Sequence, residues 1–175
     1  MRLWRVPLPT PLGTFVAVFS ERGLAQLEFP GRRPPSRAAA RPDPAPRLPA
    51  AQRRWAGLTA RALARALQGR APGRLPPLDE SGTAFQRAVW RALRDIPPGV
   101  TRTYAEVTRL VGRSAGAARA VGQACGANPI PVLTPCHRVV AAGGRLGGFS
   151  GGLAWKRRLL ALEGTGSEPA RLTAR

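Results

Sequence analysis

Apolar positions change from strand-like runs to helical spacing along the first half of the chain. Residues 14–19 (TFVAVF) and 24–29 (LAQLEF) are rich in apolar and aromatic side chains, and the turn-forming SERG sequence between them predicts a β-hairpin. Residues 30–54 are mainly Pro, Ala and Arg, a composition that predicts a long surface loop. Apolar residues then recur at helical spacing over 55–67. Residues 1–78 therefore predict a small N-terminal α/β domain.

The second half of the chain is expected to be mostly helical. The SGT sequence at 81–83 can cap a helix whose apolar residues recur at intervals of three and four, and Thr103 can cap a shorter helix that Gly112 ends. A third helix is expected over about 115–125. The last two of these helices, joined by a Gly-Arg-Ser turn, have the outline of a helix-turn-helix.

These elements together predict an α+β fold class. We expect a C-terminal domain over residues 79–165, mostly helical and containing the helix-turn-helix, and a flexible tail over 166–175. This domain would follow the N-terminal domain, whose Pro/Arg-rich loop covers 30–54.

Charge narrows the classes of partner. The chain has 28 Lys and Arg residues against 9 Asp and Glu, a net charge of +19, and Lys156 is its only lysine. Such an excess favours a polyanion, with nucleic acid ahead of an anionic membrane surface.

Other features of the sequence exclude several classes of protein. No stretch approaches the roughly 20 apolar residues that span a bilayer, and three prolines at 7, 9 and 11 interrupt any signal-peptide core. Two cysteines and one histidine supply neither a disulfide framework nor a common structural zinc site. We expect a cytoplasmic protein without metal or cofactor.

The feature that points most directly to chemistry is the neighbouring pair Cys136 and His137, in an apolar segment punctuated by prolines. A lone cysteine is commonly a small buried hydrophobic residue. A cysteine beside a base in a reducing compartment is also a candidate thiolate nucleophile. Because adjacent residues in a helical turn do not face each other, a proton would pass from Cys136 to His137 through a bridging water. These residues alone leave both interpretations open.

The surrounding motifs resemble one family. Residues 135–139 (PCHRV) resemble the active-site motif of the O6-alkylguanine-DNA alkyltransferases, also called methylated-DNA–protein-cysteine methyltransferases. Further matches follow in the family's order and extend from about residue 8 to 164, weakly through the Pro/Arg-rich loop. They are TPLG at 10–13, FQRAVW at 85–90, IPPG at 96–99, TY at 103–104, AARAVG at 117–122, SGGLA at 150–154 and LEG at 162–164.

The resemblance implies a set of catalytic roles. Cys136 would accept an alkyl group irreversibly from O6 of a guanine that has been flipped out of the DNA, so each molecule would act once. His137 would be the water-mediated base, held and polarised by Glu163. Tyr104 would donate to the guanine ring, and Asn128 would tie the recognition motif to the active-site turn.

It also implies residues that bind DNA and the base. Arg119 would enter the base stack in place of the flipped nucleotide, and the recognition helix would enter the minor groove. The remaining DNA contacts would come from Thr103, Tyr104, Arg113 and Ala118. The guanine would be bound by backbone groups around Cys136, Val139 and Ser150 and by Pro131. The expected partner is double-stranded DNA containing O6-alkylguanine, bound by a monomer.

Some positions depart from the family pattern. Thr134 stands where an aliphatic residue is usual, Phe149 stands where tyrosine is common, and Cys125 has no clear counterpart and is expected in the core. Two other functions are considered. A non-catalytic alkyltransferase-like protein would bind lesions without transfer, but such relatives replace the cysteine that is present here. A helix-turn-helix transcription regulator would have no use for the Cys-His turn.

Overall fold

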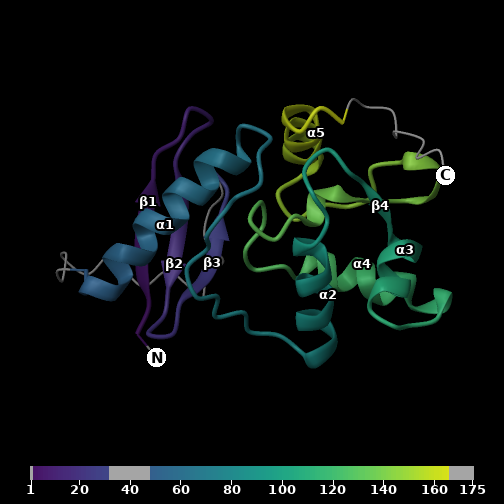
Figure 1. Cartoon of the computed structure of the whole chain (residues 1–175), viewed down its shortest axis with the longest axis horizontal. Helices are drawn as coiled ribbons and strands as arrows, with labels where there is room; N and C mark the ends of the chain where they lie inside the picture. The colour runs from purple at the N-terminus through teal and green to yellow at the C-terminus, as the bar shows by residue number, and fades with distance from the viewer. Residues whose placement is uncertain (1, 32–47, 166–175) are drawn as a thin grey trace.

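The N-terminal part of the chain forms a three-stranded antiparallel sheet (Figure 1). The structure, a computed structural model, describes residues 2–31 and 48–165. The strands β1 (Trp4–Leu8), β2 (Phe15–Phe19) and β3 (Leu24–Glu28) lie in the order β1-β2-β3. The predicted hairpin is confirmed as β2 and β3. The hydrophobic pattern does not predict β1, which contains Pro7, but an edge strand tolerates proline because one of its sides carries no ladder hydrogen bonds.

The helix that packs on this sheet, α1 (Ala50–Ala66), begins earlier than predicted. The predicted loop over 30–54 is therefore wrong at its C-terminal end. Pro49 stands at the N-cap with a φ of −57°, and the Ala, Gln and Arg residues that follow it are strong helix formers. The prolines before this point conceal the helix start in the composition. The rest of that loop, residues 32–47, and the predicted tail over 166–175 lie outside the described residues.

Both predicted caps are confirmed. Thr83 caps α2 (Ala84–Arg94) and Thr103 caps α3 (Tyr104–Leu110), each through a reciprocal capping box with the glutamine or glutamate three residues later. A 3-10 turn, η2 (Ala115–Ala117), then leads into α4 (Ala118–Gly126). The expected third helix is thus present, although its first turn is 3-10 rather than α.

Two hydrophobic clusters stabilise the molecule. The first joins the sheet and α1 to residues far along the chain, including the buried Ile130, Leu133 and Leu159. The second lies among α2, α3 and α4 around the buried Trp90 and Val121. Burying each such side chain contributes about 1.5–3 kcal/mol. The segment that precedes Cys136 thus packs against the N-terminal sheet.

Backbone contacts hold this segment to the N-terminal sheet and also pair two short strands within the second half of the chain. Leu27 N of β3 donates to Pro129 O at 2.9 Å, and the short strands β4 (Arg102–Thr103) and β5 (Val139–Val140) pair in parallel. A further 3-10 turn, η4 (Ala142–Gly144), follows β5.

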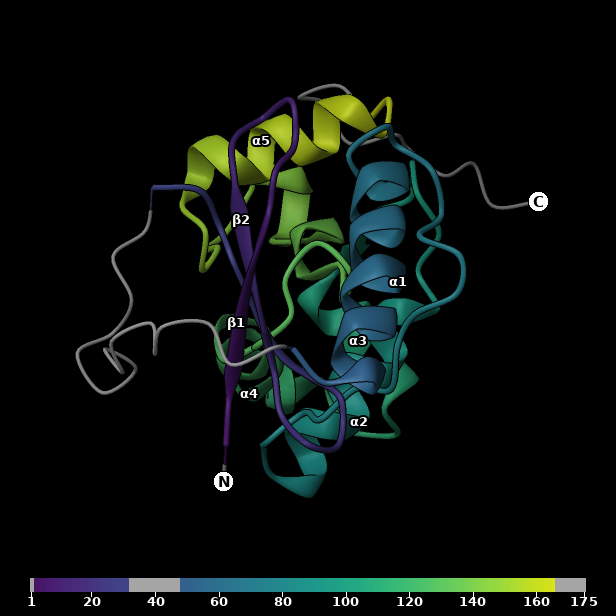
Figure 2. The same ribbon diagram turned by 90° about the vertical axis from the view of Figure 1, so that its left-hand side faces the viewer.

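The last helix, α5 (Leu153–Leu162), crosses one end of the sheet (Figure 2). Gly69, with a φ of +71°, is needed where α5 ends, because a Cβ there would lie 2.1 Å from Leu162 O. Among the helices within residues 2–31 and 48–165, none has the length and apolar character to cross a membrane.

Candidate active site

Cys136 begins the 3-10 turn η3 (Cys136–Arg138), and its side chain is buried with 3% exposed. The side-chain amide of Asn128 donates from Nδ2 to Cys136 Sγ at 3.1 Å and to Thr134 O at 2.7 Å. Asn128 Oδ1 accepts from Ile130 N at 3.0 Å. This last bond fixes which end of the amide is oxygen, since only the nitrogen can donate to the sulfur and the carbonyl. The thiol therefore faces a donor held in one orientation.

His137, Arg138 and Glu163 form a buried charged cluster beside the thiol. His137 Nε2 lies 2.9 Å from Glu163 Oε1, and their side chains are 1% and 3% exposed. Arg138 Nε donates to both carboxylate oxygens at 3.1 and 3.0 Å, Nη2 donates to Oε1 at 2.8 Å, and Nη1 donates to Ile96 O. A carboxylate only accepts, so the imidazole proton belongs on Nε2 and Nδ1 is left as an acceptor. Nδ1 is buried and has no hydrogen-bond partner within the described part of the chain.

Burial and hydrogen bonding set the charges of this site. Burial raises the pKa of the Cys136 thiol to about 11, while the Asn128 hydrogen bond and the Lys156 ammonium offset part of that rise. Burial lowers the pKa of His137 against the opposing effect of Glu163. Burial favours a raised pKa for Glu163, but the hydrogen bonds from His137 and Arg138 outweigh it and hold that pKa at about 2. At neutral pH the thiol is protonated, the imidazole is neutral and Glu163 is a carboxylate.

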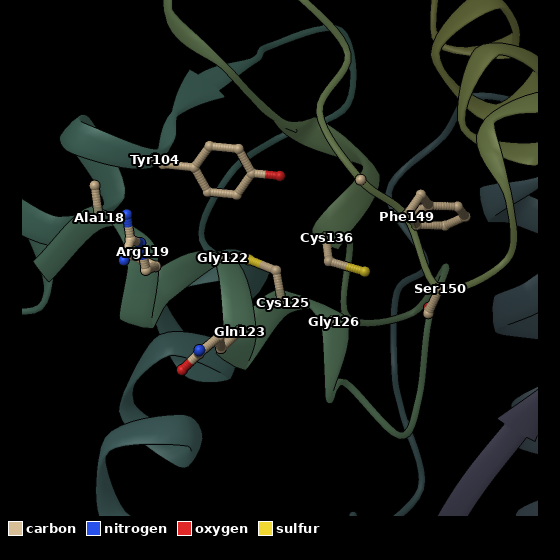
Figure 3. A pocket seen from close by; sticks show the side chains of 11 residues that line it. Tyr104, Ala118, Arg119, Gly122, Gln123, Cys125, Gly126, Cys136, Phe149 and Ser150 are labelled. Atoms are coloured by element: carbon tan, nitrogen blue, oxygen red, sulfur yellow. The ribbon is translucent and has the colours of Figure 1, made fainter.

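A cavity of about 700 Å³ reaches the Cys136 side chain (Figure 3). Its lining comes from α3, from α4, from the turn at Cys136 and from the loop before α5. The Tyr104 hydroxyl is directed into it from α3, and Phe149 lies on the side opposite α4. Gly147 permits this arrangement, because with its φ of +64° a Cβ would lie 2.8 Å from the Tyr104 hydroxyl. Burial, followed by the two cysteines, raises the pKa of Tyr104, so its hydroxyl stays a donor.

The chain has clear relatives. A family model described as the DNA-binding domain of 6-O-methylguanine DNA methyltransferase matches residues 84–165. The crystal structure of Mycobacterium tuberculosis OGT in complex with DNA is 36% identical in sequence, with a TM-score of 0.70 over 97% of each chain. The chain belongs to the methylated-DNA–protein-cysteine methyltransferase family.

Curated members of that family give closer matches over a shorter range. The methylated-DNA–protein-cysteine methyltransferase of Mycolicibacterium paratuberculosis is 56% identical over 96 residues, which are 55% of this chain and 57% of that protein. The one of Methanosarcina acetivorans is 50% identical over 88 residues, which are 50% of this chain and 56% of that protein. These alignments thus span little more than half the length of the curated relatives.

The structure brings together most residues to which the family resemblance assigns a role. Asn128 contacts the Cys136 thiol, Glu163 contacts His137, and four further predicted residues line the cavity. Those four are Tyr104, Ala118, Arg119 and Ser150. The other four lie away from the cavity: Pro131 and Val139 are buried, Thr103 caps α3, and Arg113 is exposed after α3. The roles of all these residues stay predictions.

One residue near the thiol, Lys156, is missed by the sequence reasoning. Lys156 is fully buried, and its Nζ donates to Val139 O at 2.7 Å, to Gly148 O at 3.3 Å and to Leu146 O. Burial lowers the pKa of Lys156. Its only signal in the sequence is that it is the single lysine in an arginine-rich chain. Arg138 is 3% exposed and donates to Glu163, so its role in the fold is structural.

Cys125 belongs to the second hydrophobic cluster, as expected, but it also lines the cavity. Burial raises the pKa of its thiol to about 12. Unlike Cys136, it has no histidine next to it in the chain. Among the described residues, no three His, Cys, Asp or Glu side chains gather into a group that could hold a metal ion.

Proposed function

We propose that the protein repairs DNA directly, by taking the alkyl group of O6-alkylguanine onto Cys136. The observation that carries this proposal is a cysteine that lines a cavity of about 700 Å³ and precedes a histidine in a buried His-Glu pair. Relatives named methylated-DNA–protein-cysteine methyltransferase, and a family neighbour solved in complex with DNA, support it.

The proposed step is a single displacement at the alkyl carbon. The carbon–sulfur bond forms as the bond from that carbon to O6 breaks, while the thiol proton passes through a water to His137 Nδ1. Glu163 stabilises the resulting imidazolium. Guanine leaves as an anion that a hydrogen bond from the Tyr104 hydroxyl stabilises. The anion then takes up one proton from solvent, and the imidazolium returns the thiol proton to solvent, so that guanine, neutral His137 and the thioether remain. A thioether is a poor leaving group, so the thiol is not regenerated and each molecule acts once.

We also propose how DNA is held. α3, the η2 turn and α4 would act as a helix-turn-helix within a C-terminal domain over 79–165, which follows an N-terminal domain over 1–78. The exposed Arg109, Arg113 and Arg119 support this, since arginines on one recognition unit provide affinity that is independent of sequence. Arg119 would fill the stack after a guanine is flipped into the cavity. We expect a cytoplasmic monomer that acts on double-stranded DNA.

Intact-protein mass spectrometry tests the proposal. The protein is mixed with a duplex that carries one O6-methylguanine, and the expected result is a gain of one methyl group, mapped by peptides to Cys136. Cys136→Ser should gain nothing. Cys125→Ser is the matched control, because it removes the other cavity thiol, and it should still gain one methyl group.

Two results would overturn the proposal. Lesion-selective binding without any gain of mass would indicate a non-catalytic lesion-binding protein. Absence of both transfer and lesion preference would leave a DNA-binding protein such as a helix-turn-helix regulator.

A further inference from the structure

Thr134 is a buried polar residue two positions before Cys136, with 0% of its surface exposed. Arg94 Nη1, at the C-terminal end of α2, donates to Thr134 Oγ1 at 3.1 Å and to Glu80 Oε1 at 2.5 Å. Thr134 Oγ1 in turn donates to Glu80 Oε1 at 3.5 Å. The aliphatic residue that is usual here in the family could make neither contact. The Thr134 hydroxyl is therefore anchored by an ion pair that lies outside the cavity.

The backbone of the same residue holds the active-site turn. Thr134 O accepts from Cys136 N at 2.8 Å and from Asn128 Nδ2 at 2.7 Å, and Thr134 N donates to Ile130 O at 2.9 Å. The turn closed by this last bond contains Val132, which has a φ of +74°. A β-branched residue in the left-handed region costs about 1–3 kcal/mol and persists only where its surroundings fix it. Thr134 supplies part of that constraint.

We propose that Thr134, held by the Arg94–Glu80 ion pair, is a positioning residue for alkyl transfer. This inference rests on the proposed function of Cys136. The hydroxyl fixes the peptide of Thr134, its carbonyl orients the Asn128 amide, and the amide donates to Cys136 Sγ at 3.1 Å. A donor aimed at sulfur favours the thiolate over the thiol. Thr134 thus acts on the nucleophile through Asn128 without touching the substrate.

Thr134→Val is the direct test, because valine keeps the shape of threonine and loses only the hydroxyl. Thr134→Ser restores the hydroxyl and should rescue the activity. Thr59→Val is the matched control, since Thr59 is also 0% exposed and its hydroxyl donates to Trp55 O at 2.8 Å in α1, away from the site. All three variants are compared with the wild type for thermal stability and for two reactions of Cys136.

The first reaction is single-turnover methyl transfer from O6-methylguanine DNA, and the second is alkylation by iodoacetamide without DNA. The rate of each is measured as a function of pH, and peptide mapping assigns the modification to Cys136. Thr134→Val should slow both about three- to tenfold near pH 7, the factor that corresponds to one hydrogen bond. Its iodoacetamide profile should move to higher pH, while Thr134→Ser and Thr59→Val keep the wild-type profile. If Thr134→Val does not fold, Glu80→Gln gives the same comparison, because it weakens the Arg94–Glu80 ion pair that holds the Thr134 hydroxyl.

The two reactions separate failure of this inference from failure of the proposed function. Unchanged rates and profiles in folded Thr134→Val would overturn the positioning role, whatever the change in stability. If the wild type transfers no methyl group, the proposed function fails. A shifted iodoacetamide profile would in that case still uphold the effect of Thr134 on the thiol.

Discussion

Replacing the Glu163 carboxylate should destabilise the fold strongly at neutral pH and much less in acid. Its hydrogen bonds to His137 and Arg138 outweigh burial and hold the pKa of Glu163 at about 2, against an ordinary value of 4.5. That difference corresponds to about 3 kcal/mol of stabilisation. The same loss follows from the ion pair, because Glu163→Gln keeps an acceptor oxygen but removes the negative charge that pairs with the Arg138 guanidinium, which is 3% exposed, and breaking a buried ion pair costs about 3–5 kcal/mol. We expect Glu163→Gln to lose about 3 kcal/mol near pH 7.

The sign of the pH dependence follows from the lowered pKa. A carboxyl group with a lower pKa in the folded state stabilises the fold above its unfolded pKa, and the stabilisation is lost as the pH falls toward the folded pKa. The difference between wild type and Glu163→Gln should therefore be complete above about pH 5 and shrink between about pH 5 and pH 2.

Urea unfolding, followed by tryptophan fluorescence at about pH 7 and about pH 3, measures both effects. Glu106→Gln is the control, because Glu106 pairs at 3.4 Å with Arg102, their side chains are 34% and 37% exposed, glutamine also completes a capping box, and such an exposed pair contributes at most about 1 kcal/mol. A loss from Glu163→Gln no larger than that of the control would refute the reasoning. A loss that stays constant down to pH 3 would refute the assignment of the stabilisation to the carboxylate.

Three further predictions follow from packing, hydrogen bonding and charge. Gly151→Ala should lower stability by about 1–3 kcal/mol in thermal unfolding, because its Cβ would come within 2.8 Å of the Phe149 ring, whereas Gly148→Ala, with open space around it, should not. Lys156→Met should cost about 3 kcal/mol in urea unfolding, since it strips three backbone carbonyls of their donor. Arg113→Ala should weaken binding to random duplex DNA and reduce the slope of log affinity against log salt by about one, and an unchanged slope would contradict a phosphate contact of this exposed arginine.

Much of the fold is predictable because its signals are local. The caps at Thr83 and Thr103 are visible in the sequence, since a capping box needs only a threonine and a Gln or Glu three residues later. β1 is not predictable in this way, because Trp4–Leu8 becomes a strand only through pairing with β2. The early start of α1 is hidden for a different reason, since prolines dominate the composition just before it.

The candidate site also contains residues that local sequence signals predict and residues that only the fold brings together. Cys136 and His137 are neighbours in the chain, and the family motif singles them out. The anchor of Thr134 joins residues that are 40 and 54 positions apart. Only the packing of α2 against the active-site turn brings them together. Lys156 is likewise placed only by the fold, because its three carbonyl acceptors lie in β5 and in the loop before α5.

The resting charges of the site fit the proposal that Cys136 reacts only once. With a pKa of about 11, the Cys136 thiol is protonated at neutral pH, and only 3% of its surface is exposed. The neutral imidazole of His137 can still accept its proton, and the Glu163 carboxylate is ready to stabilise the imidazolium. A permanent thiolate would react with any electrophile that entered the cavity, and each such event would consume one molecule. A nucleophile that forms only as the substrate fills the cavity avoids this loss, at the cost of a slower intrinsic reaction.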